Sequence, residues 1–434
     1  MVERAVERQS NIYLSGLAGR RSAVPADPDR LERAAGRKMS PEAFAYVVGG
    51  AGGESTVREN RAAFERWRIV PRMLRDVSGC DTSVELFGRR LPTPLLLAPI
   101  GVLELAHKEA DVAVSRAAAE IGIPAIFSTQ ASKPMEQCAR AMGAVGEAPR
   151  WFQLYWSKSD ELVESFVRRA ERCGCEAIVV TLDTTMLGWR PRDLDLAYLP
   201  FLRGKGMAQY TSDPVFRRNV SRQTRSSGAI NINLSTLRAL RELLRSYPGG
   251  LLENIVSGEP LKAVQEFLSI YSRPSLGWKD LAFLRERTRL PILLKGILSA
   301  DDARRAVEHG MDGVIVSNHG GRQLDGAIAS LDTLDGVAEA VGNKVPVLLD
   351  GGIRGGADVF KALALGAAAV CVGRPYVYGL ALAGRAGVRA VISNIAAEFD
   401  LTMALAGCRS VSELSPDNLA RPGEDVAGAR GQPL

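Results

Sequence analysis

Ser317-Asn318-His319-Gly320-Gly321-Arg322-Gln323 directly follows the apolar run Gly313-Val314-Ile315-Val316. The run is short and β-branched, which predicts a buried parallel strand. In a parallel α/β barrel, the loops after the strands carry the catalytic groups. His319 is one of only three histidines, with His107 and His309. His309 falls in the last turn of a predicted helix, where it complements the dipole. We therefore interpret His319 as a candidate base; the alternative is a loop histidine satisfied by its neighbours.

Seven further runs share the length and apolar character of this strand, and helical stretches such as 300–309 and 356–365 separate most of them. Repeated alternation of strand and helix predicts the α/β class, and eight units predict a (β/α)8 TIM barrel rather than an open sheet. The eight predicted strands are residues 94–99, 124–128, 151–155, 177–183, 291–295, 313–317, 345–350 and 368–373.

Two segments fall outside this rhythm. Residues 1–39 are predicted to form an N-terminal arm, irregular to about Pro28, before a barrel domain of residues 40–434. Ser40-Pro41-Glu42 opens an N-terminal helical segment, with Ser as the cap and Pro at the first position. About a hundred residues separate the fourth and fifth strands, so we expect a long insertion at about 184–280. An insertion at the catalytic end predicts a lid or an oligomer contact, and a disordered linker is the alternative.

Composition restricts the function. The chain is 46% hydrophobic and 24% charged with a net charge of +6, values of an ordinary soluble protein. The basic residues form no block or known motif, so we expect no nucleic-acid partner. No apolar run approaches a membrane span, and the six cysteines are scattered without metal-ligand spacing. We expect a cytoplasmic protein with free thiols, no bound metal and no membrane insertion.

Polar residues follow seven of the eight predicted strands, which indicates a polar ligand above the barrel. Lys295 stands out because it closes the run Pro-Ile-Leu-Leu. It could be a Schiff-base lysine of an aldolase, or a fixed cation facing an electron-rich cofactor ring. The strand-end residues are Ser128, Gln153 and Tyr155, Thr181 and Asp183, Lys295, Ser317 and His319, Asp350, and Gly373 and Arg374.

The last two strand ends resemble a phosphate site. Asp350-Gly351-Gly352-Ile353-Arg354 offers bare backbone beside a guanidinium, and Gly373-Arg374 repeats this one strand later. Barrels often bind phosphate after strands seven and eight. Glycine turns with surface arginines are the alternative.

Four motifs are similar to those of the FMN-dependent α-hydroxy-acid oxidases and dehydrogenases. They are residues 317–323, Leu-Asp-Gly-Gly-Ile-Arg (349–354), Lys-Ala-Leu-Ala-Leu-Gly-Ala (361–367) and Phe-Gln-Leu-Tyr (152–155), and the resemblance runs from about Ser40 to Ser412. It implies that FMN is the cofactor and that Lys295 faces the flavin rather than forming a Schiff base.

The resemblance also implies a role for each site residue. His319 would accept the substrate proton and Asp183 would stabilise the imidazolium. Arg190 and Arg322 would clamp the substrate carboxylate, and Tyr46 and Tyr155 would bind the carboxylate and hydroxyl ends of the substrate. Flavin contacts would come from Ala98, Pro99, Ile100, Gly101, Ser128, Gln153, Thr181, Lys295 and Ser317. The ribityl chain and phosphate would contact Asp350, Gly351, Gly352, Arg354, Gly373 and Arg374.

Within the family, residues 98–102, 188–194, 200–204 and 211–216 resemble the lactate monooxygenases. We therefore expect L-lactate and O2 as substrates and oxidative decarboxylation to acetate, CO2 and water. An oxidase releasing the 2-oxo acid and H2O2, or a quinone-linked dehydrogenase, is the alternative on the same scaffold. A further alternative is a non-catalytic barrel that binds FMN. Gly101 leaves room above the flavin, whereas Gln130 replaces the aromatic residue of glycolate oxidases. Members of the family are usually tetramers or octamers, so we expect a homo-oligomer.

Overall fold

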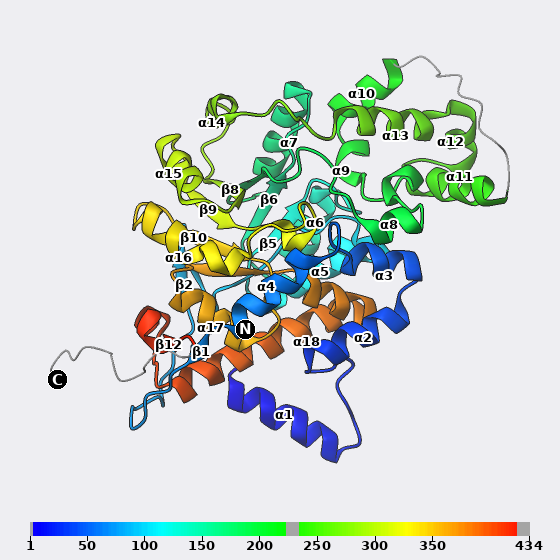
Figure 1. Cartoon of the computed structure of the whole chain (residues 1–434). Helices are drawn as coiled ribbons and strands as arrows, with labels where there is room; N and C mark the ends of the chain where they lie inside the picture. The colour runs from blue at the N-terminus through cyan, green and yellow to red at the C-terminus, as the bar shows by residue number, and fades with distance from the viewer. Residues whose placement is uncertain (1–2, 223–233, 423–434) are drawn as a thin grey trace.

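Eight parallel strands form a closed barrel in the computed structural model, which describes residues 3–222 and 234–422 (Figure 1). The strands neighbour one another in the order β10-β11-β4-β5-β6-β7-β8-β9. All eight predicted strands are confirmed, and so is the barrel. Their bounds are β4 Leu95–Leu97, β5 Ala125–Ser128, β6 Arg150–Leu154, β7 Ile178–Thr181, β8 Ile292–Ile297, β9 Gly313–Val316, β10 Val347–Asp350 and β11 Ala369–Val372.

Apolar side chains on both faces of the strands explain why the barrel closes. One set, including Leu96, Val179 and Ile315, fills the interior, and the larger set packs outward against the helices. Burial on both faces is typical of parallel strands with a helix layer outside. The helices of that layer are α5 Ala110–Ile121, α6 Met135–Gly143, α7 Asp160–Arg172, α14 Leu281–Arg285, α15 Ala300–Glu308, α16 Ser330–Val341, α17 Gly356–Ala364 and α18 Arg374–Ala406.

A hairpin closes the end of the barrel opposite the strand-end loops. It consists of β2 Val84–Leu86 and β3 Arg89–Leu91, and its leucines join the interior cluster. The Phe87 ring lies 5.7 Å from that of Trp151 in an edge-on contact. A two-stranded sheet pairs β1 Arg68–Ile69 with β12 Leu419–Ala420 near the C-terminal end of the described chain. The interior is therefore packed at this end, and a ligand must enter from the other.

The N-terminal region is helical, so the expected irregular arm is wrong for α1 Ala5–Leu17. This helix packs against α18. The Ala5 amide donates to Asp400 at 2.9 Å, and Arg8 donates to Asn394. Ala5 is the only buried residue of this helix, so its sequence lacks the apolar stripe from which a helix is usually predicted. The other three helices are α2 Pro28–Lys38, α3 Pro41–Val48 and α4 Ser55–Glu65. Ser40 caps α3 as predicted, accepting from the Ala43 amide at 3.3 Å.

The insertion is an ordered helical layer where the structure describes it, docked on α7 (Figure 1). The Tyr210 ring packs edge-on against Phe166 of α7 and against Phe216 and Phe267 of the insertion. A disordered linker is therefore wrong for these residues. Residues 223–233 of the insertion lie outside the described chain. The insertion contains α8 Pro191–Asp195, α9 Ala208–Thr211, α10 Pro214–Arg222, α11 Leu234–Ser246, α12 Leu251–Ser257 and α13 Glu259–Ile270.

The helix α18 is 33 residues long and bears on the expectation that no apolar run approaches a membrane span. It is the one helix of the described residues that is long and apolar enough to cross a membrane by length and composition. Of its most apolar window, 56% is buried inside the protein, against neighbours that include α5, α17 and α2. Its backbone leaves helical geometry at Ala383 and Gly384. Its apolar character serves the protein core.

Candidate active site

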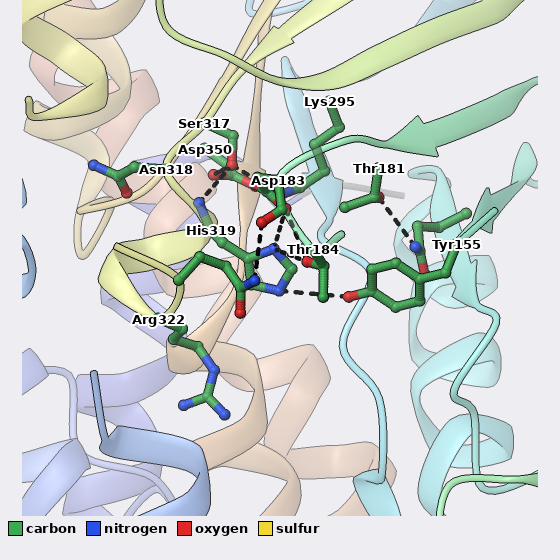
Figure 2. A network of polar contacts seen from close by, with 12 residues as sticks. Tyr155, Thr181, Asp183, Thr184, Lys295, Ser317, Asn318, His319, Arg322 and Asp350 are labelled. Carbon is green, nitrogen blue, oxygen red and sulfur yellow. Dashed lines mark hydrogen bonds and ion pairs between the residues drawn. The ribbon is translucent and has the colours of Figure 1, made fainter. Parts of the chain in front are cut away.

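His319 and Asp183 meet at the strand-end face of the barrel (Figure 2). His319 begins the short 3-10 helix η4 His319–Gly321 after β9, and Asp183 follows β7. The imidazole Nδ1 lies 2.8 Å from Asp183 Oδ1. Burial opposes ionisation of Asp183, yet His319 and Lys295 outweigh it and hold its pKa at about 2. Burial lowers the pKa of His319, partly offset by Asp183, so the neutral imidazole of a base is favoured.

The loop carrying His319 has an unusual backbone. His319, Gly320 and Gly321 adopt φ angles of 58°, 62° and 78°, in the left-handed region. A non-glycine residue there stores strain, a feature concentrated at functional sites. A Cβ on Gly321 would lie 2.8 Å from the backbone nitrogen of Val57 in α4. The Gly-Gly pair of the motif is therefore required by close packing as well as by the turn.

Lys295 is a fixed cation rather than a Schiff-base nucleophile. Its Nζ lies 3.0 Å from Asp350 Oδ2 and 3.9 Å from Asp183 Oδ2, and donates to Ser317 Oγ at 2.8 Å. Although burial favours the neutral amine, the two carboxylates raise the pKa of Lys295 above its ordinary value. A nucleophilic lysine must lose its proton, so these partners disfavour the aldolase alternative.

Tyr155 and Thr184 surround the imidazole. The Tyr155 hydroxyl lies 3.5 Å from His319 Nε2, on the ring edge opposite Asp183. Burial raises the pKa of Tyr155 to about 12, so its hydroxyl stays protonated. Thr184 Oγ1 donates to Asp183 Oδ1 at 3.0 Å and lies 3.4 Å from His319 Nδ1. Sequence reasoning missed Thr184, although its position beside Asp183 was a usable signal.

Arg190, which is buried, and Arg322, which is half-buried, form a cationic pair in the pocket wall. Arg190 donates to the Arg322 carbonyl at 3.1 Å and to Gln323 Oε1 at 2.9 Å. Arg322 donates to the Gly49 carbonyl at 2.6 Å and lies over the Tyr46 ring. Burial first and then Arg190 lower the pKa of Arg322 to about 9. These hydrogen bonds all go to neutral oxygens, so the pair is suited to receive an anion.

Polar side chains are hydrogen-bonded to one another across the neighbouring strands β5, β6 and β7. Ser128 donates to Gln153 Oε1 at 3.1 Å, and Gln153 Nε2 donates to Thr181 Oγ1 at 3.0 Å. Ser128, Gln153 and Thr181 are not among the described residues that line the pocket, which reaches both glycine turns. The predicted residues that line it are Tyr46, Ala98, Pro99, Ile100, Gly101, Tyr155, Arg190, Lys295, His319, Arg322, Asp350, Gly351, Gly352, Arg354, Gly373 and Arg374. Ser317 joins through Lys295, as described above.

Arg374 lies in the pocket wall in an unexpected arrangement. It donates to the backbone carbonyls of Val47, Gly49 and Gly320 at 3.1, 3.1 and 2.9 Å. It therefore ties the end of α3 to the loop of His319, and a role at the phosphate stays a prediction. Arg354 donates to the adjacent Ile353 carbonyl at 3.0 Å.

Side chains of the insertion complete the pocket. Leu187, Phe201 and Tyr271 line it, and sequence reasoning named none of them as site residues. Gln130 also lines the pocket, where a Cβ on Gly101 would approach the Gln130 Cβ to 3.0 Å. The other two histidines lie elsewhere: His107 accepts from the Glu109 amide, and His309 stacks on Trp278.

The chain matches known proteins over nearly its whole length. The family described as FMN-dependent dehydrogenase matches residues 35–421. An L-lactate oxidase of Lysinibacillus sphaericus is 43% identical, covering 90% of this chain and 92% of the relative. An FMN-dependent alpha-hydroxy acid dehydrogenase of Penicillium citrinum is 41% identical, covering 95% of each chain. The crystal structure of mandelate oxidase with (S)-4-hydroxymandelic acid superposes with a TM-score of 0.74 at 36% identity, covering 91% and 98%.

The chain belongs to the FMN-dependent α-hydroxy-acid oxidoreductase family, whose expected fold and cofactor are confirmed. Its reaction is the FMN-dependent oxidation of a 2-hydroxy acid. The site fits the cofactor: Lys295 is a buried cation, and Asp183 Oδ2 is buried without a hydrogen bond among the described residues. The individual roles of the site residues stay predictions.

Proposed function

We propose that the protein oxidises a small L-2-hydroxy acid, L-lactate, with O2 as the acceptor. The single observation that carries the chemistry is the imidazole of His319 held 2.8 Å from Asp183 beside the arginine pair. The similarity to an L-lactate oxidase supports the substrate and the acceptor. We further propose that the protein is cytoplasmic and assembles as a homo-oligomer.

In the proposed reaction, Arg322 and Arg190 bind the substrate carboxylate and orient the carbon that bears the hydroxyl group. His319 Nε2 takes up the substrate proton, and Asp183 stabilises the imidazolium that forms. The protonated Tyr155 hydroxyl, beside the same nitrogen, orients the substrate oxygen. FMN, when bound in this pocket, would supply the two-electron redox chemistry that connects the hydroxy acid to O2 and yields H2O2. Lys295 would hold a positive charge beside it.

We propose oxidative decarboxylation as the outcome, in which H2O2 attacks pyruvate before either leaves the site. Lactate and O2 then give acetate, CO2 and water. This outcome needs slow release of pyruvate. Residues 184–199, here called the lid segment, are pinned to the N-terminal helices in a way that supports it. Arg192 donates to both Glu54 oxygens at 2.7 and 2.6 Å, and the Gly52 amide donates to the Trp189 carbonyl at 2.8 Å.

A product assay tests the proposal. Purified holoenzyme receives L-lactate in air, with catalase in a parallel tube. Acetate and CO2 without free peroxide, unchanged by catalase, is the expected result. Pyruvate with stoichiometric peroxide contradicts decarboxylation and supports the second candidate, an L-lactate oxidase, which the 43% identical relative favours. Absence of O2 uptake, with flavin bleaching that only a quinone or dye reverses, indicates a dehydrogenase.

A further inference from the structure

Asn60 is a buried polar residue in the middle of α4, with 3% of its surface exposed. Its side chain forms a reciprocal pair with that of Asn318. Each amide Nδ2 donates to the other residue's Oδ1 at 2.8 Å. Asn60 Oδ1 also accepts from the Ser330 amide at 3.2 Å. When buried amide groups are hydrogen-bonded in this way, one arrangement is favoured. Breaking one of the hydrogen bonds would leave a buried donor or acceptor unpaired.

Asn318 directly precedes His319, and its amide braces the turn that carries the imidazole. Its Oδ1 accepts from the Gly321 amide at 3.1 Å, and its Nδ2 donates to the Ile328 carbonyl at 3.0 Å. Figure 2 shows the side chain of Asn318 pointing away from the imidazole and from Asp183. The pair with Asn60 therefore supports the strained backbone of His319 from behind, without contact with the pocket.

Asn60 also contacts the turn of the predicted phosphate site. A Cβ on Gly352 would lie 2.3 Å from the Asn60 carbonyl oxygen, and a Cβ on Gly351 would lie 3.5 Å from Asn60 Nδ2. One residue of α4 thus touches both the loop of His319 and the turn after β10. The start of α4 is fixed independently, since Asp325 accepts from the amides of Gly53 and Thr56 at 2.6 and 3.1 Å.

We propose that Asn60 is a positioning residue, which acts through Asn318 to hold His319 and the Gly351–Gly352 turn at a fixed spacing. The base and the cofactor-binding turn would then be set relative to one another by α4 rather than by the barrel strands alone. This inference rests on the FMN chemistry of the family and is independent of whether lactate is the substrate.

The test compares Asn60→Ala and the equal-sized Asn60→Asp, which lacks the donor to Asn318 Oδ1. Asn254→Ala is the matched control, because Asn254 is 2% exposed and bonds two carbonyls in the insertion. Two quantities are measured: the FMN dissociation constant of each apoprotein, and the anaerobic rate of flavin reduction with FMN in excess. The 2-hydroxy acid used is the one that bleaches wild-type flavin fastest.

We expect both Asn60 variants to bind FMN more weakly and to reduce it about tenfold more slowly at saturating substrate, with little change in KM. Asn254→Ala should stay within about twofold of wild type. The double variant Asn60→Ala/Asn318→Ala should be no slower than the slower single variant, because the two residues act through one contact. Wild-type rates and FMN affinity in both Asn60 variants, or multiplying losses in the double variant, would overturn the proposal. Failure of every hydroxy acid to bleach wild-type flavin would count against the proposed function, and the FMN affinities would still decide this inference.

Discussion

Asp183 Oδ1 lies 2.8 Å from His319 Nδ1, while the other carboxylate oxygen of Asp183 faces Lys295 Nζ at 3.9 Å. The Asp183 carboxylate therefore lies between His319, the proposed base, and Lys295, the cation proposed to face the flavin. Because Asp183 stays ionised, it raises the proton affinity of an otherwise desolvated imidazole. The geometry links proton uptake at His319 to the charge beside the flavin.

The pH dependence of flavin reduction follows from the lowered pKa of His319. A base must be neutral to accept a proton, so the rate should fall as pH drops through a value below the ordinary 6.5 and stay level above it. Replacing Asp183 by Asn removes the charge that raises this pKa. We therefore expect an acid limb at still lower pH and a plateau rate reduced about a hundredfold or more. Stopped-flow reduction across the pH range measures both; an unchanged profile in Asp183→Asn would contradict this account of the dyad.

Substitution of Arg322 tests the binding of the substrate carboxylate. Arg322→Lys keeps the charge but loses the planar fork, so we expect the KM for the hydroxy acid to rise about tenfold or more. Arg322→Leu should raise it further, because Arg190 alone then faces the carboxylate. Steady-state kinetics with FMN in excess separate KM from kcat. If Arg322→Leu lowered kcat alone, Arg322 would not bind the ground-state carboxylate.

The ion pair between Arg192 and Glu54 tests the role of the lid segment. Arg192→Ala removes both hydrogen bonds to Glu54, so pyruvate should leave sooner and the share of free peroxide should rise. Arg66→Ala is the control, since Arg66 pairs with Glu59 at the surface outside the pocket. Peroxide and acetate are measured in the same reaction. An unchanged ratio in Arg192→Ala would mean that this contact does not govern product release.

The sequence was sufficient for the barrel because each strand is a short run of buried residues, and all but the first have a polar end. Those ends meet at one face of a parallel barrel, which brought Ser128, Lys295 and His319 together in the prediction. Tyr271 and Asn60 could not be found in this way. Tyr271 reaches the pocket only through the folding of the insertion, and Asn60 is one polar residue within an ordinary helix. Their roles depend on tertiary contacts that no local pattern records.

The prediction for the N-terminal segment, an irregular arm where the structure has helix α1, was wrong for a related reason. Its exposed face carries Tyr13 and Leu17 and its buried face only Ala5, so the usual periodicity is missing. Arg374 shows how far a motif can predict a site residue. The motif placed Arg374 in the pocket but did not predict its three backbone carbonyl partners.

The measurement that tests the central claim most directly is anaerobic flavin reduction by L-lactate in wild type and in His319→Gln. The account predicts rapid bleaching in wild type. It predicts bleaching about a hundredfold to ten-thousandfold slower in the variant, which keeps its FMN because His319 only accepts a proton. Reduction of the variant at the wild-type rate would contradict the assignment of His319 as the base, and a wild-type flavin that lactate leaves oxidised would contradict the proposed substrate.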